Sequence, residues 1–337
     1  MEVRPVDPDD EAAFDGWYAI LRETDLERWP DFGGWSRREV HALTSATHGA
    51  DAYHCLVAVD PSGVTVGIAL CEVPQRDNRQ IASLDVRVQR EHRRRGVGTA
   101  IVADAGRRLA AEGRTVLTSL VEVPVAMVDA YPATPFALRL GFVAAQVGNR
   151  RHLVLPVATD LLARVRDEVA QAAVGYRVFT FLAPWPTEYL DDQCELGRRM
   201  STDAPSGDLQ FEEEVWDAAR VEESNQLLAR QGVRKLVAVA MHVASGRLVA
   251  FSELALPHDH PHEAWQWATL VLREHRGHRL GLAVKLANLD YLATSVPGVR
   301  VVTTGNAREN VPMITLNDML GFEVVADGTF WQKERVT

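Results

Sequence analysis

Two short basic turns, each containing glycine, have the residue types needed to hold a phosphate group. The first reads Arg-Arg-Arg-Gly-Val-Gly-Thr, and the second reads Arg-Gly-His-Arg-Leu-Gly-Leu. Each follows an apolar run typical of a strand and precedes a long helical pattern. Backbone N–H groups at the start of a helix bind phosphate oxygens, and glycine lets the backbone approach them closely. The sequence therefore predicts a phosphorylated cofactor at both turns. The residues expected to contact it are Arg93, Arg94, Arg95, Gly96, Val97, Gly98 and Thr99 in the first turn, and Arg276, Gly277, His278, Arg279, Leu280, Gly281 and Leu282 in the second.

The two turns belong to a duplicated segment. Both are introduced by Arg-Glu-His-Arg, ending at positions 93 and 276, which lie 183 positions apart. A Gly-Phe pair follows in each half, at 141–142 and 321–322. This offset is far above the roughly 20–50 residues of a solenoid repeat. We therefore expect one domain at 1–157, a connecting helix at 158–175 and a second domain at 176–337.

The apolar patterns predict similar elements in the two halves, which suits a mixed sheet carrying helices on both faces. In the first half, strands are expected at 3–6, 53–59, 64–73, 81–88, 115–121, 142–147 and 152–155, and helices at 11–26, 36–44, 99–111 and 135–140. In the second half, strands are expected at 176–181, 236–243, 248–256, 264–272 and 299–304, with helices at 187–200, 211–231, 280–294 and 311–320. The pair Asp327-Gly328 predicts a final hairpin of strands 322–325 and 329–332.

Composition narrows the class of protein. The formal net charge of −10 disfavours nonspecific nucleic-acid binding, which depends on broad positive potential. The three cysteines have no metal-binding spacing, and the histidines at 258, 260 and 262 favour a surface turn over a metal site. With no signal sequence and no apolar run of about 18 residues, we expect a cytoplasmic protein without metal, nucleic-acid or membrane partners.

The arrangement resembles the Gcn5-related N-acetyltransferase (GNAT) family. The first turn fits the family's Arg/Gln-x-x-Gly-x-Gly/Ala motif fully, whereas the second has Arg279 in place of the first motif glycine. The resemblance implies an α/β fold of two tandem GNAT domains, similar in layout to two-domain actinobacterial enzymes such as mycothiol synthase. It also implies acetyl-CoA as the cofactor, with its pyrophosphate at the turns.

Further roles follow from the resemblance. The strand before each turn is expected to pair with the pantetheine arm. The asparagines Asn306 and Asn310 are expected to bind pantetheine or to order a water, with helix capping by Asn306 as the alternative. Asn317 stands where many family members have a tyrosine acid, and Ala137 is its counterpart in the first half. The strand residues concerned are Val86 and Val88 in the first half, and Leu270, Val271 and Leu272 in the second.

Family members need a base to deprotonate the attacking amine, and three carboxylates could serve. Glu253 lies in an apolar strand and faces either a cleft, where burial would raise its pKa, or solvent by simple alternation. In the first half the candidates are Asp85 and Glu72, although Arg87 could be a simple salt-bridge partner of Asp85. We expect Glu253, Asp85 and Asn317 to be the catalytic residues.

The sequence thus predicts acetyl transfer from acetyl-CoA to a primary amine of a small molecule, by direct attack with general-base assistance. The second half is favoured as the catalytic one because its asparagine set is fuller, with the first half retaining cofactor or acting structurally. The alternative is a non-catalytic acyl-CoA-binding protein. Either would be a monomer or a homodimer.

Overall fold

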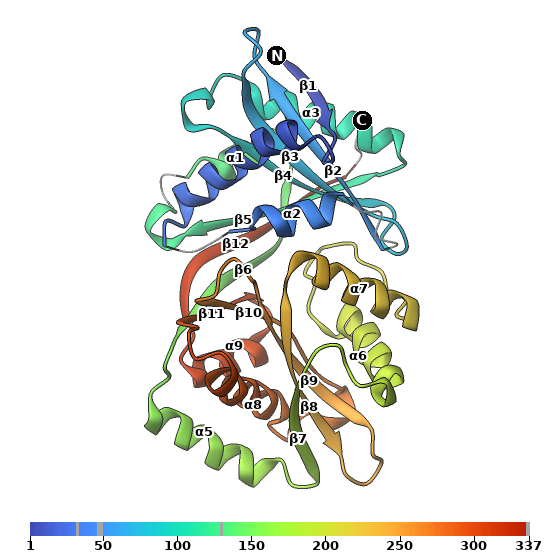
Figure 1. Cartoon of the computed structure of the whole chain (residues 1–337), viewed down its shortest axis with the longest axis vertical. Helices are drawn as coiled ribbons and strands as arrows, with labels where there is room; N and C mark the ends of the chain where they lie inside the picture. Colours follow the sequence, from blue (N-terminus) through green and yellow to red (C-terminus); the bar gives the residue numbers. More distant parts are fainter. Residues whose placement is uncertain (32–33, 46–49, 129–130, 335–337) are drawn as a thin grey trace. The chain divides into compact units, whose positions relative to one another are not determined.

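The computed structural model describes residues 1–31, 34–45, 50–128 and 131–334. The chain forms two compact units, whose helices and strands are labelled in Figure 1. Unit 1 comprises Met1–Val147, Gly207–Phe211 and Asp327–Thr337, and unit 2 comprises Gly148–Ser206 and Glu212–Ala326. Among the described residues, no helix is long and apolar enough to cross a membrane.

Unit 1 is a mixed sheet in the order β1-β2-β3-β4-β5-β12, in which β1 to β4 pair antiparallel and β4 pairs parallel with β5. Its strands are β1 (Glu2–Val6), β2 (Asp51–Val59), β3 (Thr65–Pro74), β4 (Ile81–Val88), β5 (Val116–Pro124) and the later part of β12 (Glu323–Glu334). Its helices are α1 (Glu11–Arg28), α2 (Arg37–Thr44), α3 (Val97–Ala111) and α4 (Ala133–Arg139).

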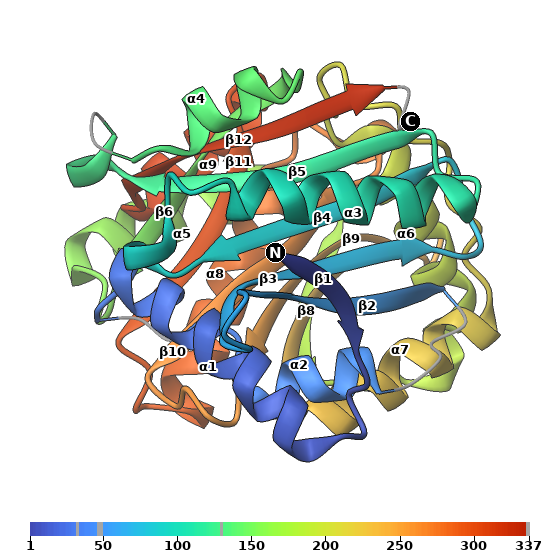
Figure 2. The ribbon, with the colours of Figure 1, turned by 90° about the horizontal axis from the view of Figure 1, so that it is seen from above.

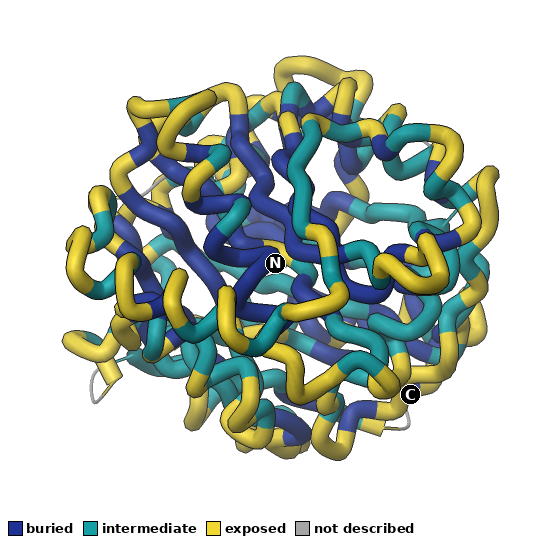
Figure 3. Tube along the Cα trace, turned by 90° about the horizontal axis from the view of Figure 1, so that it is seen from below, coloured by how far each residue is buried: buried dark blue, intermediate teal, exposed yellow. Residues whose placement is uncertain are grey.

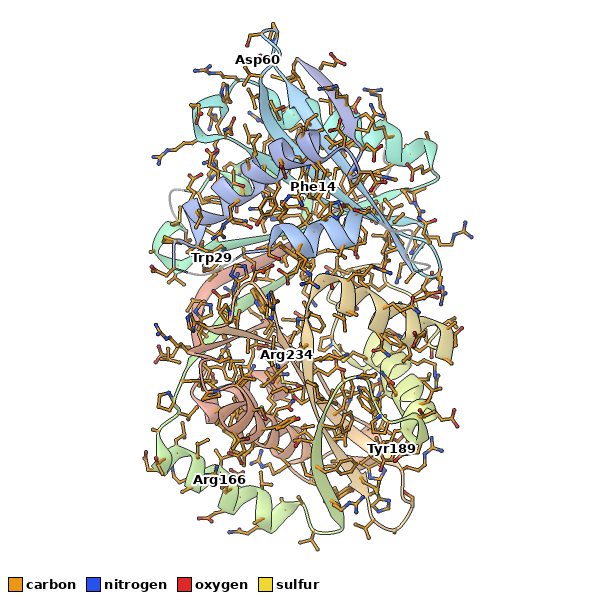
Figure 4. All side chains as sticks on the ribbon, in the orientation of Figure 1. Phe14, Trp29, Asp60, Arg166, Tyr189 and Arg234 are labelled. Atoms are coloured by element: carbon orange, nitrogen blue, oxygen red, sulfur yellow. The ribbon has the colours of Figure 1, made fainter. Side chains whose placement is uncertain are left out.

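Helices cover both faces of the unit 1 sheet (Figure 2). Alternate strand residues pack with α3 in one core, and the intervening residues pack with α1 and α2 in another. Phe14 and Trp17 of α1 belong to the second core and are 0% exposed. Figure 4 labels Phe14 on α1. Ser36 caps α2 through a capping box with Glu39, as the sequence predicts for an N-cap residue.

Unit 2 repeats this layout in the order β6-β11-β10-β9-β8-β7. Its strands are the later part of β6 (Val143–Val154), β7 (Tyr176–Leu182), β8 (Arg234–His242), β9 (Leu248–Leu256), β10 (Glu263–Val271) and β11 (Val301–Ala307). Its helices are α5 (Thr159–Ala172), α6 (Leu190–Asp203), α7 (Ala218–Gln231), α8 (Leu280–Ser295) and α9 (Val311–Leu320). All residues of β9 are buried, because helices pack against this central strand on both faces. Figure 3 colours the buried stretches of the chain dark blue and the exposed ones yellow.

The compact units do not coincide with the sequence halves, because two strands pass from one unit to the other. Residues 148–154 of β6 pair antiparallel with β11 in unit 2, and β12 after Ala326 belongs to unit 1. The segment 158–175, expected as a connector, is mostly α5 and belongs to unit 2, where α5 packs on α8 and α9. The observed division therefore differs from boundaries at 157 and 176.

The passage of β6 and β12 from one unit to the other explains two wrong predictions, one near the end of each sequence half. Strands 142–147 and 152–155 are one continuous strand, β6, and the hairpin expected at Asp327-Gly328 is one continuous strand, β12. A strand that continues from one sheet into the next keeps its backbone hydrogen bonds, so no turn is needed. The helix expected at 211–231 begins only at Ala218, where the Asp217 side chain caps it.

Candidate active site

In unit 1 the two parallel strands part along their length. The register of β4 and β5 joins Ile81 to Val116, Ala82 to Leu117 and Ser83 to Thr118. Beyond Ser83, β4 continues to Val88 paired with β3 alone, as far as the described residues show. One edge of this segment is therefore open, and an extended ligand could add to it as a strand does.

Unit 2 has the same geometry. The register of β10 and β11 ends at the pair Trp265 and Thr303, whereas β10 remains paired with β9 up to Val271. The segments expected to bear the pantetheine arm thus lie on an open edge in both units. They contain Val86 and Val88 in unit 1, and Leu270 and Val271 with the adjacent Leu272 in unit 2.

The two basic turns adopt the same backbone conformation despite their different sequences. In the first, Arg94 and Gly96 are left-handed, with φ of 61° and 85°. In the second, Gly277 and Arg279 occupy the matching positions, with φ of 87° and 53°. Each turn thus has one glycine and one arginine in the left-handed region, where a non-glycine residue costs roughly 1–2 kcal/mol. The departure at Arg279 therefore leaves the turn's shape intact, since Gly277 relieves the strain at the other position.

Both turns open helices whose N-termini carry no side-chain cap. No side chain caps α3 or α8, and neither has an acidic residue in its first turn. By contrast, Asp10, Ser36 and Asp217 cap α1, α2 and α7. The first N–H groups of a helix have no partner within it and favour an anion. A Cβ added at Gly96 or Gly277 would meet no atom within 4 Å, so both turns have room for a ligand.

The second motif glycine has a packing role. A Cβ on Gly98 would lie 3.0 Å from the ring of Phe136 in α4, and one on Gly281 would lie 2.9 Å from Leu316 in α9. Each glycine therefore lets a neighbouring helix approach the start of α3 or α8. This role exists without any cofactor.

The first arginine of each turn is engaged within the fold. The guanidinium of Arg93 donates to the carbonyl of Val88 at 3.0 Å and to Glu27 of α1 at 2.9 Å. In unit 2, Arg276 likewise donates to the carbonyl of Val271 at 3.2 Å and to Asp203 at 2.9 Å. Hydrogen bonds from Arg93 lower the pKa of the Glu27 carboxyl. These arginines fix the turn to the preceding strand and helix, and their side chains are not free for phosphate.

The remaining side chains distinguish the turns. Arg94 and Arg95 of the first turn are exposed, whereas Arg279 of the second forms an ion pair with Glu168. Arg273, just before the second turn, pairs with Asp203 at 2.9 Å. The first turn therefore offers more unengaged positive charge to a phosphate. The other predicted contacts are Thr99, which is exposed, His278, which packs against Tyr176, and Val97, Leu280 and Leu282, whose side chains are in the core.

A row of polar side chains crosses unit 1 where β4 and β5 part. Register aligns Tyr53 with Glu72, Glu72 with Ser83, and Ser83 with Thr118. Paired residues share a face of a sheet, and Tyr53 lies on the same face as Cys55, which packs with α1 and α2. The row therefore lies on the α1–α2 face, beside the open edge of β4.

Glu72 is the titratable member of this row. Burial, together with the negative charge of Asp51, raises the pKa of its carboxyl to about 7, against a hydrogen bond from Tyr53 that lowers it. Burial raises the pKa of the Tyr53 hydroxyl, which therefore remains protonated and donates. A carboxylate that titrates near neutral pH is suited to general-base catalysis.

Asp85 lies two residues beyond Ser83 on the same face. Arg87 donates to both of its oxygens, at 2.7 and 2.8 Å, so the expected salt bridge is present. Surrounding protein atoms raise the pKa of the Asp85 carboxyl to about 6, while the charge of Arg28 acts against this. Its side chain nevertheless keeps 43% of its surface accessible. Asp85 can therefore meet a ligand from solvent.

In unit 2 the predicted base is neutralised. Glu253 is 9% exposed, which rules out the solvent-facing alternative. Its carboxylate forms an ion pair with Lys235 at 2.8 Å, and both side chains are largely buried. Removing a proton from an amine would require breaking this pair, since a buried charge is stabilised by its partner.

The asparagines of unit 2 have separate roles. Asn310 caps α9 by accepting from the N–H of Met313 at 3.3 Å, so the capping expected of Asn306 falls to Asn310. Asn317 is 0% exposed and donates to Asn306 at 2.6 Å. Its oxygen accepts from Lys285 at 2.7 Å. The structure thus brings Asn306 and Asn317 together and separates Asn310 from them.

A cavity of about 470 Å³ in unit 1 adjoins the polar row, since Tyr53 lines it together with His54 of β2 and with Leu109 and Glu112 at the end of α3. It lies at the opposite end of α3 from the turn. No group of three or more His, Cys, Asp or Glu side chains in the described part of the chain could hold a metal ion.

The sequence reasoning missed Lys285 and the ion pairs of α1. Lys285 could have been found, since it is the one charged residue of the run Leu280–Leu289 in an apolar helix. By contrast, Asp25 of α1 binds Arg87 at 2.9 Å across 62 positions of sequence, and no local pattern signals this contact.

Comparison with known proteins agrees with this geometry. Residues 14–142 match the acetyltransferase (GNAT) family, and no curated protein matches the chain. A tandem GNAT protein from the clavulanic acid biosynthesis pathway, solved without AcCoA, is 27% identical with a TM-score of 0.76, over 99% of this chain and 98% of the other. The first repeat therefore matches the acetyltransferase (GNAT) family by sequence, and the chain is similar in fold to a tandem GNAT protein along nearly its whole length.

Two other solved structures show the same fold at lower identity. A GCN5-related N-acetyltransferase from Sphaerobacter thermophilus is 16% identical with a TM-score of 0.63, over 99% of this chain and 95% of that chain. Saccharomyces cerevisiae N-myristoyltransferase, with bound myristoyl-CoA and inhibitors, is 13% identical with a TM-score of 0.58, over 99% and 80%. These two structures show that the chain has the same fold along nearly its whole length.

Proposed function

We propose that this protein transfers an acetyl group from acetyl-CoA to a primary amine of a small molecule, and that unit 1 carries out the transfer. The observation that carries the proposal is Glu72, a carboxylate titrating near neutral pH beside the point where β4 and β5 part. The first turn, with its exposed Arg94 and Arg95, supports binding of the cofactor's phosphates in the same unit.

In this reaction the amine nitrogen attacks the thioester carbonyl carbon. The C–N bond forms, the C–S bond breaks, and CoA leaves as the thiolate. Glu72 accepts the proton that the amine loses, directly or through one water, and Tyr53 orients the carboxylate. The open edge of β4 supplies backbone N–H groups that can bind the pantetheine arm and the carbonyl oxygen.

Unit 2 is then the module that binds acyl-CoA without catalysing transfer. Its turn has the required backbone, but Glu253 is paired with Lys235, and Asn317 is engaged by both Lys285 and Asn306. This proposal differs from the sequence-based prediction that the second half is the catalytic one, because the fuller asparagine set is engaged in internal contacts. A cytoplasmic location and a monomeric or homodimeric state remain predictions.

The test compares matched carboxylate-to-amide changes in the two units. Glu72→Gln should lower kcat for acetylation of amines by about 10²–10⁴-fold, the usual contribution of a general base. Glu253→Gln should leave kcat within about twofold in protein that remains folded, because the proposed reaction does not use it. CoA release with a panel of primary amines is the assay. Full activity of Glu72→Gln, or loss of activity only in Glu253→Gln, would contradict the proposal.

A further inference from the structure

A chain of four alternating charges links α1 to β4 in unit 1. Arg28 binds Asp25 at 2.9 Å, Asp25 binds Arg87 at 2.9 Å, and Arg87 binds Asp85 at 2.7 Å. The two inner members, Asp25 and Arg87, are each satisfied from both sides. The two outer members, Arg28 and Asp85, each have a partner on one side only among these contacts.

The outer members have capacity left for a ligand. The Nε of Arg28 is buried and has no hydrogen-bond partner among the residues that the structure describes, and only 10% of the side chain is exposed. A buried guanidinium N–H without a partner is costly, so the site favours an acceptor group there. Asp85 has 43% of its side chain accessible, and carboxylate oxygens can accept more bonds than the two from Arg87.

The two outer residues of this series of charges, Arg28 and Asp85, lie near one another. Arg28 and Arg87 both lie 2.9 Å from the same oxygen of Asp25, and Arg87 in turn lies 2.7 Å from Asp85, so one carboxylate and one guanidinium separate the two outer residues. One small molecule could therefore contact both ends. Asp85 in turn is a diagonal neighbour of Glu72 across β3 and β4, since Leu70 faces Asp85 and Glu72 faces Ser83.

We propose that the acceptor is an amine that also carries a carboxylate, as an amino acid does. Its carboxylate binds Arg28, and its ammonium group binds Asp85 before the nitrogen loses a proton to Glu72. This inference rests on the proposed function and adds the chemical class of the acceptor. Arginine recognises carboxylates through a fixed set of N–H donors, so the pairing is selective as well as attractive.

The four charged side chains balance one another, which explains why a ligand with a single charge would not match the site. Its two acids and two bases cancel, so the site does not attract a ligand by net charge. A simple cationic amine would satisfy Asp85 but would leave the Arg28 N–H unpaired. A zwitterion adds one charge of each sign at matching ends and keeps the whole site neutral.

The test uses acceptors that share the amine and differ only in the acid group. Amino acids with small, aliphatic and aromatic side chains are each compared with their carboxamides and with their decarboxylated amines, by CoA release at saturating acetyl-CoA. We expect kcat/KM to be at least about tenfold higher for the acids, the typical effect of one charge-assisted hydrogen bond. Equal values across each triplet would overturn the inference while leaving the proposed function intact.

Variants locate the carboxylate site. Arg28→Gln should lower kcat/KM for the acid by more than for the decarboxylated amine, so that the preference for the acid is lost, and Arg28→Lys should keep part of the preference. Arg22→Gln is the matched control, because Arg22 is on the same helix and also has a buried N–H without a partner. If Arg22→Gln abolishes the preference and Arg28→Gln does not, the anion site is elsewhere and the inference is wrong. If the wild type binds acetyl-CoA but acetylates no amine in the panel, the proposed function fails and the inference fails with it.

Discussion

Replacing Lys285 by methionine should remove a large dependence of unit 2 stability on pH. The Lys285 side chain is 2% exposed, and its ammonium contacts the oxygen of Asn317 at 2.7 Å and the ring of Phe322 at 5.4 Å. Neither partner carries a negative charge. Burial accordingly lowers the pKa of Lys285 from 10.5 to about 7.

The sign and size of the effect follow from that shift. Because the folded-state pKa is below the unfolded value, the contribution of Lys285 to stability is present above about pH 10.5 and is lost as the pH falls toward 7. At about 1.36 kcal/mol for each pH unit, the wild type should lose about 3 kcal/mol between pH 9.5 and pH 7 through this group. Lys285→Met lacks this loss, although it also leaves the Asn317 oxygen without its donor.

The assay is denaturant unfolding of wild type and Lys285→Met at pH 7 and pH 9.5. The difference in the free energy of unfolding between the two proteins should change by about 3 kcal/mol, with the variant gaining at pH 7. The control is Lys333→Met, at a partly exposed lysine of unit 1, which separates the effect of removing a buried lysine from that of removing any lysine. A constant difference for Lys285→Met would refute the argument that this lysine is a buried charge without a counterion.

Three other changes test individual contacts. Arg93→Gln should lower the stability of unit 1 by about 1.5–3 kcal/mol in thermal unfolding, since it removes charged hydrogen bonds to Glu27; no loss would show that the turn does not need this arginine. Glu253→Gln should cost about 3–5 kcal/mol in urea unfolding at pH 7, because it leaves Lys235 buried without its partner, and a neutral result would refute the ion pair. Asn310→Ala should lower the free energy of unfolding by about 1 kcal/mol in the same assay because the α9 cap is lost, whereas Asn310→Asp should retain most of the stability of the cap.

Local patterns in the sequence predicted most of the elements. Strand β4 and helix α9 have the expected bounds, and α3 begins two residues earlier than expected. These elements are defined by apolar spacing and by glycines near their ends, which are local signals. The predictions for β6 and β12 were wrong because the continuity of these strands depends on partners far away in the sequence.

The turns were predicted from sequence, but the meaning of their differences was not. Reading the motif alone makes Arg279 a defect, whereas the structure shows Gly277 taking the other left-handed position. A motif position specifies a residue type, but the backbone needs only suitable φ values at two positions. Such compensation becomes visible when dihedral angles are known.

Candidate bases could be named from sequence but not ranked. Glu253 and Glu72 both lie in apolar strands, so alternation alone gives them similar weight. Their environments differ because Lys235 of β8 faces Glu253, whereas Tyr53 of β2 and Asp51 surround Glu72. Those neighbours come from other strands, and the register that brings them together is not encoded locally.

The central claim, acetyl transfer in unit 1, is tested most directly by the KM for acetyl-CoA after placing a negative charge at each turn. A side chain at Gly96 or Gly277 meets no atom at its Cβ, and both positions have a left-handed backbone, so the two aspartate substitutions should carry a similar strain of about 1–2 kcal/mol. Gly96→Asp should raise the KM in amine acetylation by at least about tenfold through repulsion of phosphate, whereas the neutral Gly96→Asn and the matched Gly277→Asp should change it little. An unchanged KM in Gly96→Asp together with a raised KM in Gly277→Asp would contradict the account and place the reaction in unit 2.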